Sequence, residues 1–408
     1  MDAETRKRDL RKSMPLWAST PSISVITSKS PSSRSYDLIV VGAGISGALV
    51  AEALADGKRS ILVIDRRKPV TGSTMASTAM IQHEIDTPLA DLSRLIGPNA
   101  AARAWRRSVA AVRALGEKVA ELDLSCGYRE KATLYLSGEE AGARKLEAEA
   151  RARRSAGLEV DYLGGADVAS RFGIARAAGL VSHASASCNP AQLTAGLLRA
   201  ARTRGIEIVE GVEITDLAEF GERVALATNQ GSLLEAGHVV FCTGYEFLES
   251  VRHKSHSIAS TWAIATPKAT QALPDWLADM LVWEAADPYL YFRMTRDGRL
   301  IAGGEDEDDP EAFQSPAKLK SKTKRIAAKI SALLGVSLPE PEFTWSAGFG
   351  VTPTGLPYID RVPGMRHAYA VMGFGGNGIT FSQIASEIVR AEIEGGSDPD
   401  SGLFRFPV

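Results

Sequence analysis

The chain has 408 residues, of which 45% are hydrophobic and 24% are charged, and its formal net charge is -2. This composition is typical of a globular protein with a large core, and the near-neutral charge gives no reason to expect a nucleic-acid partner. The three cysteines form no CxxC pair, which argues against a cysteine-rich zinc site and a disulfide framework and favours the cytoplasm; we expect no metal site. No apolar run of about 18 residues predicts an integral membrane segment.

Residues 1–35 differ from the rest of the chain. A basic start, MDAETRKRDLRKS, is followed by an apolar stretch interrupted by Ser, Thr and Pro. That stretch is too broken for a secretory signal. We therefore expect a leader that is poorly ordered or draped over the folded part.

Residues 36–67 have the pattern of a dinucleotide-binding unit. A short apolar strand, Leu38 to Val41, leads into Gly42, Gly44 and Gly47 and then into a helix of small residues. The first glycine allows a tight turn, the second lets the backbone approach a pyrophosphate, and the third lets helix and strand pack closely. The N-terminus of such a helix favours an anion.

A second apolar strand, residues 60–64, ends at Asp65, which lies 23 positions after Gly42. A carboxylate near this spacing binds a ribose and disfavours a 2′-phosphate, so NADP is not favoured despite the neighbouring Arg66 and Arg67. NAD and FAD use the same binding unit, and this segment does not distinguish them.

The remaining elements alternate between helix and strand along the chain. We predict helices at residues 100–124, 139–154, 190–204 and 317–334, and strands at 131–137, 206–210, 223–228, 232–235, 237–243 and 369–373. Asp297-Gly298 predicts a hairpin between two apolar runs. The last strand leads into a second glycine-rich loop that opens a helix, and the tail after Gly395 is expected to be loosely held.

Four segments in order, GAGISG with Asp65, FCTGYE, TPTGLPYID and GFGGNGIT, resemble the FAD-dependent amino-acid oxidase family, which includes glycine, sarcosine and D-amino-acid oxidases. The resemblance implies an α/β fold: a Rossmann-like FAD-binding domain with a doubly wound parallel sheet, and an interleaved α+β substrate domain on a mostly antiparallel sheet. It implies FAD-binding segments at 36–90, 160–255 and 345–408, and substrate-domain segments at 91–159 and 256–344.

The resemblance also implies which residues hold FAD. They are Gly42, Gly44, Ile45, Ser46, Gly47, Asp65, Arg66, Ser73, Thr74, Ser77, Val212, Thr243, Gly244, Gly375, Asn377, Gly378, Ile379 and Thr380. No cysteine lies near the C-terminal loop, so we expect non-covalent FAD, and we interpret His83 as a packed residue rather than a flavin link. Two positions depart from the family pattern, because Phe349 replaces a common basic residue and Thr354 replaces an acid.

The substrate side is expected on the segment YLYFR. A strand would place Tyr289, Tyr291 and Arg293 on one face. Arginine is a natural clamp for a carboxylate, so we predict Arg293 as the anchor and the two tyrosines as helpers. The alternative is an ordinary ion pair between Arg293 and Glu305 or Asp306.

The predicted activity is hydride transfer from the amine-bearing carbon of an amino acid or secondary amine to flavin N5, followed by hydrolysis of the imine. Oxygen or a separate electron carrier would reoxidise the flavin. One alternative is a dehydrogenase of a 2-hydroxy acid or a polyol phosphate on the same scaffold, and another is a non-catalytic flavin-binding subunit.

Overall fold

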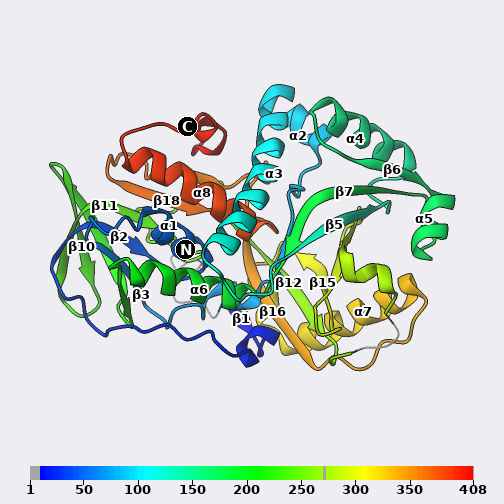
Figure 1. Cartoon of the computed structure of the whole chain (residues 1–408), viewed down its shortest axis with the longest axis horizontal. Helices are drawn as coiled ribbons and strands as arrows, with labels where there is room; N and C mark the ends of the chain where they lie inside the picture. The colour runs from blue at the N-terminus through cyan, green and yellow to red at the C-terminus, as the bar shows by residue number, and fades with distance from the viewer. Residues whose placement is uncertain (1–9, 270–272, 408) are drawn as a thin grey trace.

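The computed structural model describes residues 10–269 and 273–407. It has two lobes that lie side by side along the longest axis of the molecule, each built on its own β-sheet (Figure 1). The two expected components of the fold, a doubly wound parallel sheet with helices and a mostly antiparallel sheet, are both present.

The first lobe is built on an eight-stranded sheet. In spatial order its strands are β17 (Tyr358–Arg361), β18 (Ala368–Met372), β11 (Leu233–Phe241), β2 (Ser35–Val41), β3 (Ile61–Asp65) and β8 (Glu207–Glu210), with β10 (Arg223–Thr228) and β9 (Ile214–Phe220) as an antiparallel extension of β11. The strands from β18 to β8 are parallel, and their continuous apolar runs suit strands that are covered on both faces. The two short strands expected at 232–235 and 237–243 are one strand, β11.

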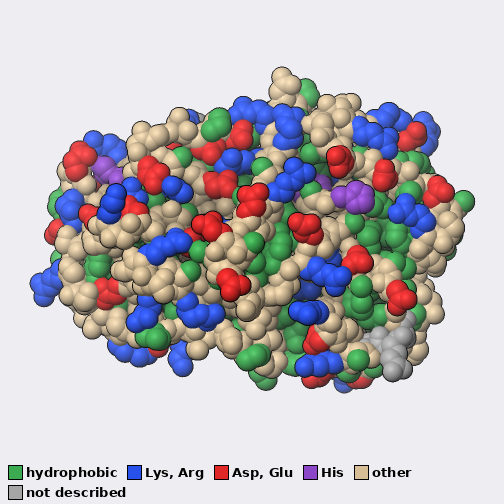
Figure 2. Space-filling model, viewed as in Figure 1, with side chains coloured by type: hydrophobic (Ala, Val, Ile, Leu, Met, Phe, Trp, Pro, Cys, Tyr) green, Lys and Arg blue, Asp and Glu red, His purple; other side chains and the backbone are tan. Residues whose placement is uncertain are grey.

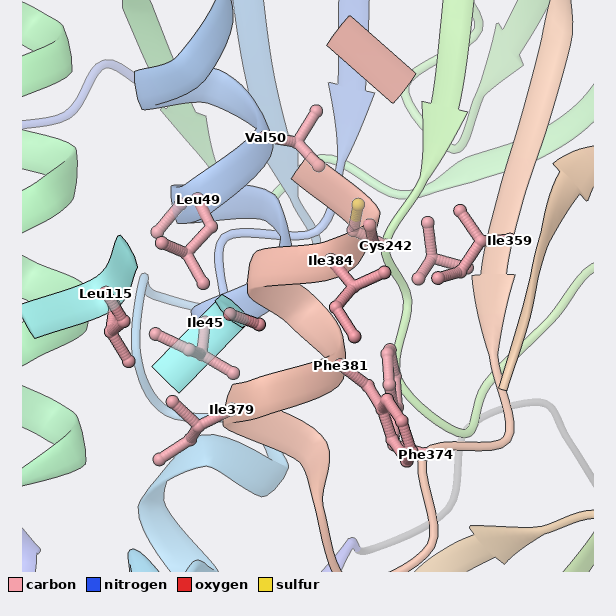
Figure 3. Packing of buried hydrophobic residues seen from close by; sticks show 14 of the residues in the cluster. Ile45, Leu49, Val50, Leu115, Cys242, Ile359, Phe374, Ile379, Phe381 and Ile384 are labelled. Carbon is pink, nitrogen blue, oxygen red and sulfur yellow. The ribbon is translucent and has the colours of Figure 1, made fainter. Parts of the chain in front are cut away.

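Four helices cover one face of this sheet: α1 (Ile45–Leu54), α3 (Pro98–Glu121), α6 (Pro190–Thr203) and α8 (Gly378–Ile393). Ile45 and Leu49 of α1 lie beside α8, with Leu115 of α3 on the far side (Figure 3). The opposite face packs against β9, β10 and the chain end. The expectation of a loosely held tail is wrong, because the tail buries Phe404 and Phe406.

The second lobe is built on a ten-stranded sheet. Its strands run in the order β1 (Arg11–Lys12), β16 (Phe343–Val351), β12 (Ser257–Ala265), β15 (Leu300–Glu307), β14 (Leu290–Met294), β13 (Met280–Glu284), β5 (Arg129–Leu136), β7 (Ala178–Ser187) and β4 (Met80–Ile81), and β6 (Asp161–Gly164) pairs with β7. All of these pairs are antiparallel except β13 with β5. β4, β6, β7 and most of β16 thus belong to this sheet although their residues fall in the predicted FAD-binding segments. The domain bounds themselves stay a prediction.

Helices α2 (Leu89–Ile96), α4 (Ala143–Ser155), α5 (Gly165–Phe172) and α7 (Pro316–Leu334) complete the second lobe. α7 and α5 pack their apolar side chains, such as Ile326 and Val168, on the outer face of the sheet. The inner face turns toward the first lobe, so the two sheets enclose the space between them.

The described part of the N-terminal segment is draped over both lobes. β1 pairs with β16, Trp17 is buried, and Ser28 forms a bridge to Val209. Residues 1–9 lie outside the described residues. Acidic and basic side chains are interspersed on the face shown in Figure 2, and no helix within residues 10–269 and 273–407 has the length and apolar character needed to cross a membrane.

A buried ion triad joins α4 to the chain around it. Arg153 of α4 pairs with Glu84 and, at 2.8 Å, with Glu149, and all three side chains are buried. Glu149 also accepts the backbone N–H groups of Leu89 and Ala90 at 2.9 Å each, which satisfies the free donors at the start of α2. Burial raises the pKa of Glu84, but the Arg153 guanidinium, together with His83 and Thr133, holds that pKa below its usual range.

We expect the Arg153→Met substitution to destabilise the protein by about 3–5 kcal/mol, because it leaves two buried carboxylates without their cation. Urea unfolding of the substituted and unsubstituted proteins measures the difference. The matched control is Arg151→Met on the same helix, where the side chain is 62% exposed and pairs with Glu147; it should unfold as the unsubstituted protein does. Equal effects of the two substitutions would contradict this account.

Candidate active site

A cavity of about 670 Å³ lies between the two lobes. Of the predicted site residues, those that line it are Gly42, Gly44, Ile45, Ser46, Asp65, Arg66, Ser73, Thr74, Ser77, Val212, Thr243, Gly244, Gly375, Gly378, Ile379, Tyr289 and Tyr291. Gly47, Asn377, Thr380 and Arg293 do not line it. Apart from these four, the predicted residues come together at one cavity although they lie far apart in the sequence.

The turn from β2 into α1 forms one end of the cavity. Gly42 has φ 111°, and a Cβ atom there would lie 2.3 Å from the carbonyl oxygen of Cys242. A Cβ at Gly47 would lie 1.8 Å from the carbonyl oxygen of Gly42. Gly47 thus serves the close packing of helix and turn that is expected of the third glycine, and its contact with the pyrophosphate stays a prediction.

Asp65, at the end of β3, lies beside this turn. Its carboxylate accepts the backbone N–H groups of Ala43 and Arg67, both at 2.7 Å. Burial raises the pKa of Asp65, although these two N–H groups act in the opposite direction. Arg66 and Arg67 both pair with Glu246, so their charges are compensated within this end of the cavity.

The segment after β3 closes the cavity from the side. It forms a short 3-10 helix, Ser73–Ala76, whose Thr74 hydroxyl accepts the backbone N–H of Ile45 at 3.0 Å. Two tryptophans hold its far end: Trp17 Nε1 donates to the carbonyl of Ser77 at 2.6 Å, and Trp345 Nε1 donates to the carbonyl of Ala76 at 2.8 Å. Both anchors come from outside the segment, so its shape depends on the second lobe and the N-terminal segment.

The C-terminal glycine-rich loop borders the same cavity and is held by Asp86. The Asp86 carboxylate accepts the N–H of Gly376 at 2.7 Å and the Asn377 side-chain amide at 3.2 Å. Asn377 also donates to the carbonyl of Glu84, and Thr380 donates to the carbonyl of Gln82. The side chains of Asn377 and Thr380 therefore contact the loop after β4, and their contact with the flavin stays a prediction.

Tyr289 and Tyr291 form the wall opposite the glycine turns. Their ring centroids are 5.7 Å apart, and burial raises the pKa of both phenols. Gly303 on the adjacent strand leaves room for the second ring, because a Cβ there would lie 2.3 Å from the Tyr291 hydroxyl oxygen. Strand alternation correctly predicts that both tyrosines share a face.

The prediction that Arg293 anchors a substrate carboxylate disagrees with its position. The Arg293 side chain is buried beyond the cavity wall, where it donates to the carbonyl of Thr78 at 2.7 Å and to that of Cys188 at 3.1 Å. Its guanidinium lies 5.7 Å from the centre of the Trp17 ring. Arg293 therefore holds two backbone segments together, and among the described residues no ion pair joins it to Glu305 or Asp306; its role as a substrate anchor stays a prediction.

The cavity is acidic beyond the tyrosines, which the sequence patterns did not predict. Carboxylates from several elements line it there, namely Glu84, Asp86, Asp91, Glu140, Glu284, Asp287, Asp306 and Asp308. Glu84 and Glu284 are paired with arginines, whereas Asp306 has no such partner in the part of the chain that the structure describes. The sequence shows an acidic run at residues 305–309, but it does not show which of these side chains face the cavity.

Two further aromatic residues extend this wall. Tyr135 and Trp283 stack with ring centroids 3.8 Å apart, and Trp283 Nε1 donates to Glu84 at 3.0 Å. His83, in contrast, does not line the cavity. It contacts the carbonyl of Ala184 at 3.0 Å, and burial lowers its pKa to about 4, as expected for a packed neutral histidine.

The dinucleotide end of the cavity fits FAD. The N-termini of α1 and α8 both border the cavity, and neither N-cap residue provides a side-chain cap. Apart from the Ile45 N–H, which donates to Thr74, the first N–H groups of these helices can meet electron-rich oxygens. The Thr243 hydroxyl, which also faces this end, is buried without a hydrogen-bond partner among the described residues. The absence of a side chain at Gly44 opens the approach to α1.

Comparison with known proteins gives the same assignment. The sequence model of the DAO family, described as FAD dependent oxidoreductase, matches residues 37–391. The fold is similar to glycine oxidase from Geobacillus kaustophilus (TM-score 0.74, 20% identity, 90% of this chain and 96% of that chain) and to L-proline dehydrogenase from P. horikoshii (TM-score 0.75, 17% identity, 92% and 96%).

Among curated proteins, the oxidoreductase OrdL of Rhizobium meliloti is 25% identical over 224 residues, which are 53% of this chain and 49% of OrdL. YhfW of Bacillus subtilis, named as a Rieske 2Fe-2S iron-sulfur protein, is 23% identical over 213 residues, which are 52% of this chain and 41% of YhfW. The match spans about half the length of these relatives or less.

We expect Gly44→Val to weaken FAD retention about 10-fold, because its branched side chain would enter the approach to α1, where even a Cβ atom would lie 3.1 Å from the Thr74 hydroxyl. Visible flavin absorbance after gel filtration measures retention. Gly402→Val is the matched control, since its Cβ would meet no atom within 4 Å. Full retention by the Gly44 variant would show that this turn does not hold the cofactor.

Proposed function

Because the chain belongs to the DAO family of FAD-dependent oxidoreductases, we propose that it oxidises a carbon–nitrogen bond of an amine or amino acid. Bound FAD supplies the acceptor at flavin N5 for a hydride that leaves the amine-bearing carbon, and the imine that remains hydrolyses. The observation that carries the proposal is the meeting of both glycine-rich turns and the Tyr289–Tyr291 wall at one cavity.

Residues from both glycine-rich turns would hold FAD. Gly42, Gly44 and the start of α1 would face the diphosphate, and Asp65 the ribose. Gly375, Gly378 and Ile379 would face the flavin ring, where the N-terminus of α8 stabilises negative charge on its pyrimidine side. The stretch from Ser73 to Ser77 would lie along the cofactor between these two ends.

Non-covalent binding of FAD is supported by the positions of the residues that could form a link. His83, Cys126 and Cys188 do not line the cavity. Cys242 lines it beside the turn at Gly42, and burial raises the pKa of its thiol, so it is not a reactive thiolate at neutral pH.

The charges of the cavity favour an amine over the alternative substrates. A 2-hydroxy acid or a polyol phosphate needs a cationic anchor beside the reacting carbon. The basic residues that line the cavity are Arg66 and Arg67, at the ribose end and paired with Glu246, and Lys145, an exposed residue 3.7 Å from Asp91. An amine substrate, in contrast, is attracted by the carboxylates. The family assignment also disfavours a non-catalytic flavin-binding subunit.

The protein must also orient its substrate and keep water out. The stacked Tyr135–Trp283 pair and the Tyr289–Tyr291 pair give two flat apolar surfaces, which can position the carbon chain of the substrate next to the acceptor. Oxygen or an electron carrier then removes the electrons.

We expect amines to bleach the flavin under anaerobic conditions, whereas 2-hydroxy acids and glycerol phosphate should leave it yellow. Stopped-flow absorbance of the holoenzyme measures the reduction. Readmission of oxygen then distinguishes an oxidase, which recovers its colour rapidly, from a dehydrogenase, which recovers it slowly. Reduction by glycerol phosphate but by no amine would replace this proposal with the polyol phosphate alternative.

A further inference from the structure

Asp306 occupies an unusual position in the cavity wall. It lies in β15, next to Tyr289, which directly precedes β14, and Thr261 on β12, and all three residues line the cavity. Both of its carboxylate oxygens are buried and have no hydrogen-bond partner of normal geometry among the described residues. The Thr261 and Tyr289 hydroxyls face it closely enough to lower its pKa, but burial dominates and raises that pKa to about 6.

The preceding residue, Glu305, is a buried acid whose charge is compensated by cations. Glu305 points to the other side of the strand, where Arg325 contacts it at 2.7 Å and Lys322 at 3.7 Å, and Lys329 also pairs with it. These cations hold the pKa of Glu305 below its usual range against the effect of burial. Within residues 10–269 and 273–407, Asp306 has no equivalent cation.

The remaining groups around Asp306 do not compensate its charge. Asp86, from the loop after β4, acts to raise its pKa, and Lys322 of α7 acts to lower it. Lys322, however, contacts Glu307 at 2.8 Å and donates to the backbone of Glu305, so it belongs to the other side of the sheet. The neighbouring faces on the cavity side are the Tyr289 and Tyr291 rings, which attract cations.

A buried carboxylate without a cation is costly to the fold, and such a group in a cavity is suited to a cationic ligand. We propose that Asp306 receives the ammonium group of the substrate and removes one proton from it, so that the site selects cationic amines that carry no carboxylate on the reacting carbon. This inference rests on the proposed amine oxidation and names its substrate class and its base.

The proton transfer balances without a further reactant. One N–H bond of the ammonium breaks and one O–H bond forms on an Asp306 oxygen, so that a positive and a negative group become two neutral ones. Loss of both charges is favoured in a site with little water. The neutral amine would then have a free electron pair for the C=N bond, FAD would supply the hydride acceptor for the adjacent carbon, and Asp306 would return its proton to water after product release.

The same arrangement disfavours an amino acid. Its α-carboxylate would lie near Asp306 and Asp86, and the buried arginine of this strand face, Arg293, is occupied by the carbonyls of Thr78 and Cys188. The negative charges of the α-carboxylate and of these two aspartates would repel each other strongly in a buried site. A simple amine or a diamine avoids this repulsion.

The test compares Asp306→Asn with Glu307→Gln, which changes the next residue on the side of α7, outside the cavity lining. Both holoenzymes are mixed anaerobically with butylamine, 1,4-diaminobutane, glycine and proline. We expect Asp306→Asn to keep its FAD but to lose about 100-fold in the rate of flavin reduction by the two amines. Glu307→Gln should behave as the unsubstituted protein.

The pH dependence of the unsubstituted holoenzyme gives a second readout that needs no variant. Asp306 must be ionised to receive the ammonium, and its pKa is about 6, so kcat/KM for amines should fall as the pH drops through about 6. A merely structural role would leave kcat/KM without this acid limb, and Asp306→Asn should also lack it.

A binding experiment separates this inference from the proposed function. Tetramethylammonium, which cannot be oxidised at a C–H next to a neutral amine, should perturb the visible flavin spectrum of the unsubstituted protein, and benzoate should not. Equal reduction rates in both variants, or a preference for glycine and proline, would overturn the role of Asp306 while leaving amine oxidation intact. If neither amines nor amino acids reduce the flavin, the proposed function fails. In that case, binding of tetramethylammonium to the unsubstituted protein and not to Asp306→Asn would still support the cation site.

Discussion

The close packing of α1 against α8 is the constraint on which the rest of the site depends. Both helices cover the same face of the parallel sheet, and the Ser46 and Ser382 hydroxyls form a buried hydrogen bond of 2.7 Å between them. Because both helices start at the cavity, this packing brings two helix N-termini that are more than 300 residues apart in sequence toward one ligand. The glycines at 42 and 47 are what permit the first of these helices to sit so close to its turn.

The parts of the molecule that sequence patterns predict well are those controlled by local rules. The strand, the glycine turn, the helix and Asp65 follow each other within 30 residues, and short-range backbone geometry determines their arrangement. Alternation along β14 likewise predicts that Tyr289, Tyr291 and Arg293 share a face. It does not predict how far along that face the cavity extends, and Arg293 lies past its edge, under Trp17.

The residues that were missed depend on irregular geometry and on distant partners. The register between β12 and β15 shifts at Ser260 and Trp262, opposite Glu305 and Asp306, and Glu305 has φ 59°. Such a bulge changes which side chains face the core, so two neighbouring acids in an apparently uniform acidic run have different environments. Asp86 holds the C-terminal loop across 290 residues of sequence, and neither propensity nor spacing reveals that contact.

The N-terminal segment before β2 holds the 71–77 loop, which lines the cofactor side of the cavity, through hydrogen bonds. Arg11 donates to the carbonyl of Thr71, Trp17 donates to that of Ser77, and Leu10 itself lines the cavity. These residues precede the part of the chain that the family shares, which begins at residue 37. A polypeptide trimmed to that shared region would keep every glycine of the nucleotide fingerprint. It would lose the hydrogen bonds from Arg11 and Trp17 to the 71–77 loop, and it would therefore be purified with less bound flavin than the longer protein.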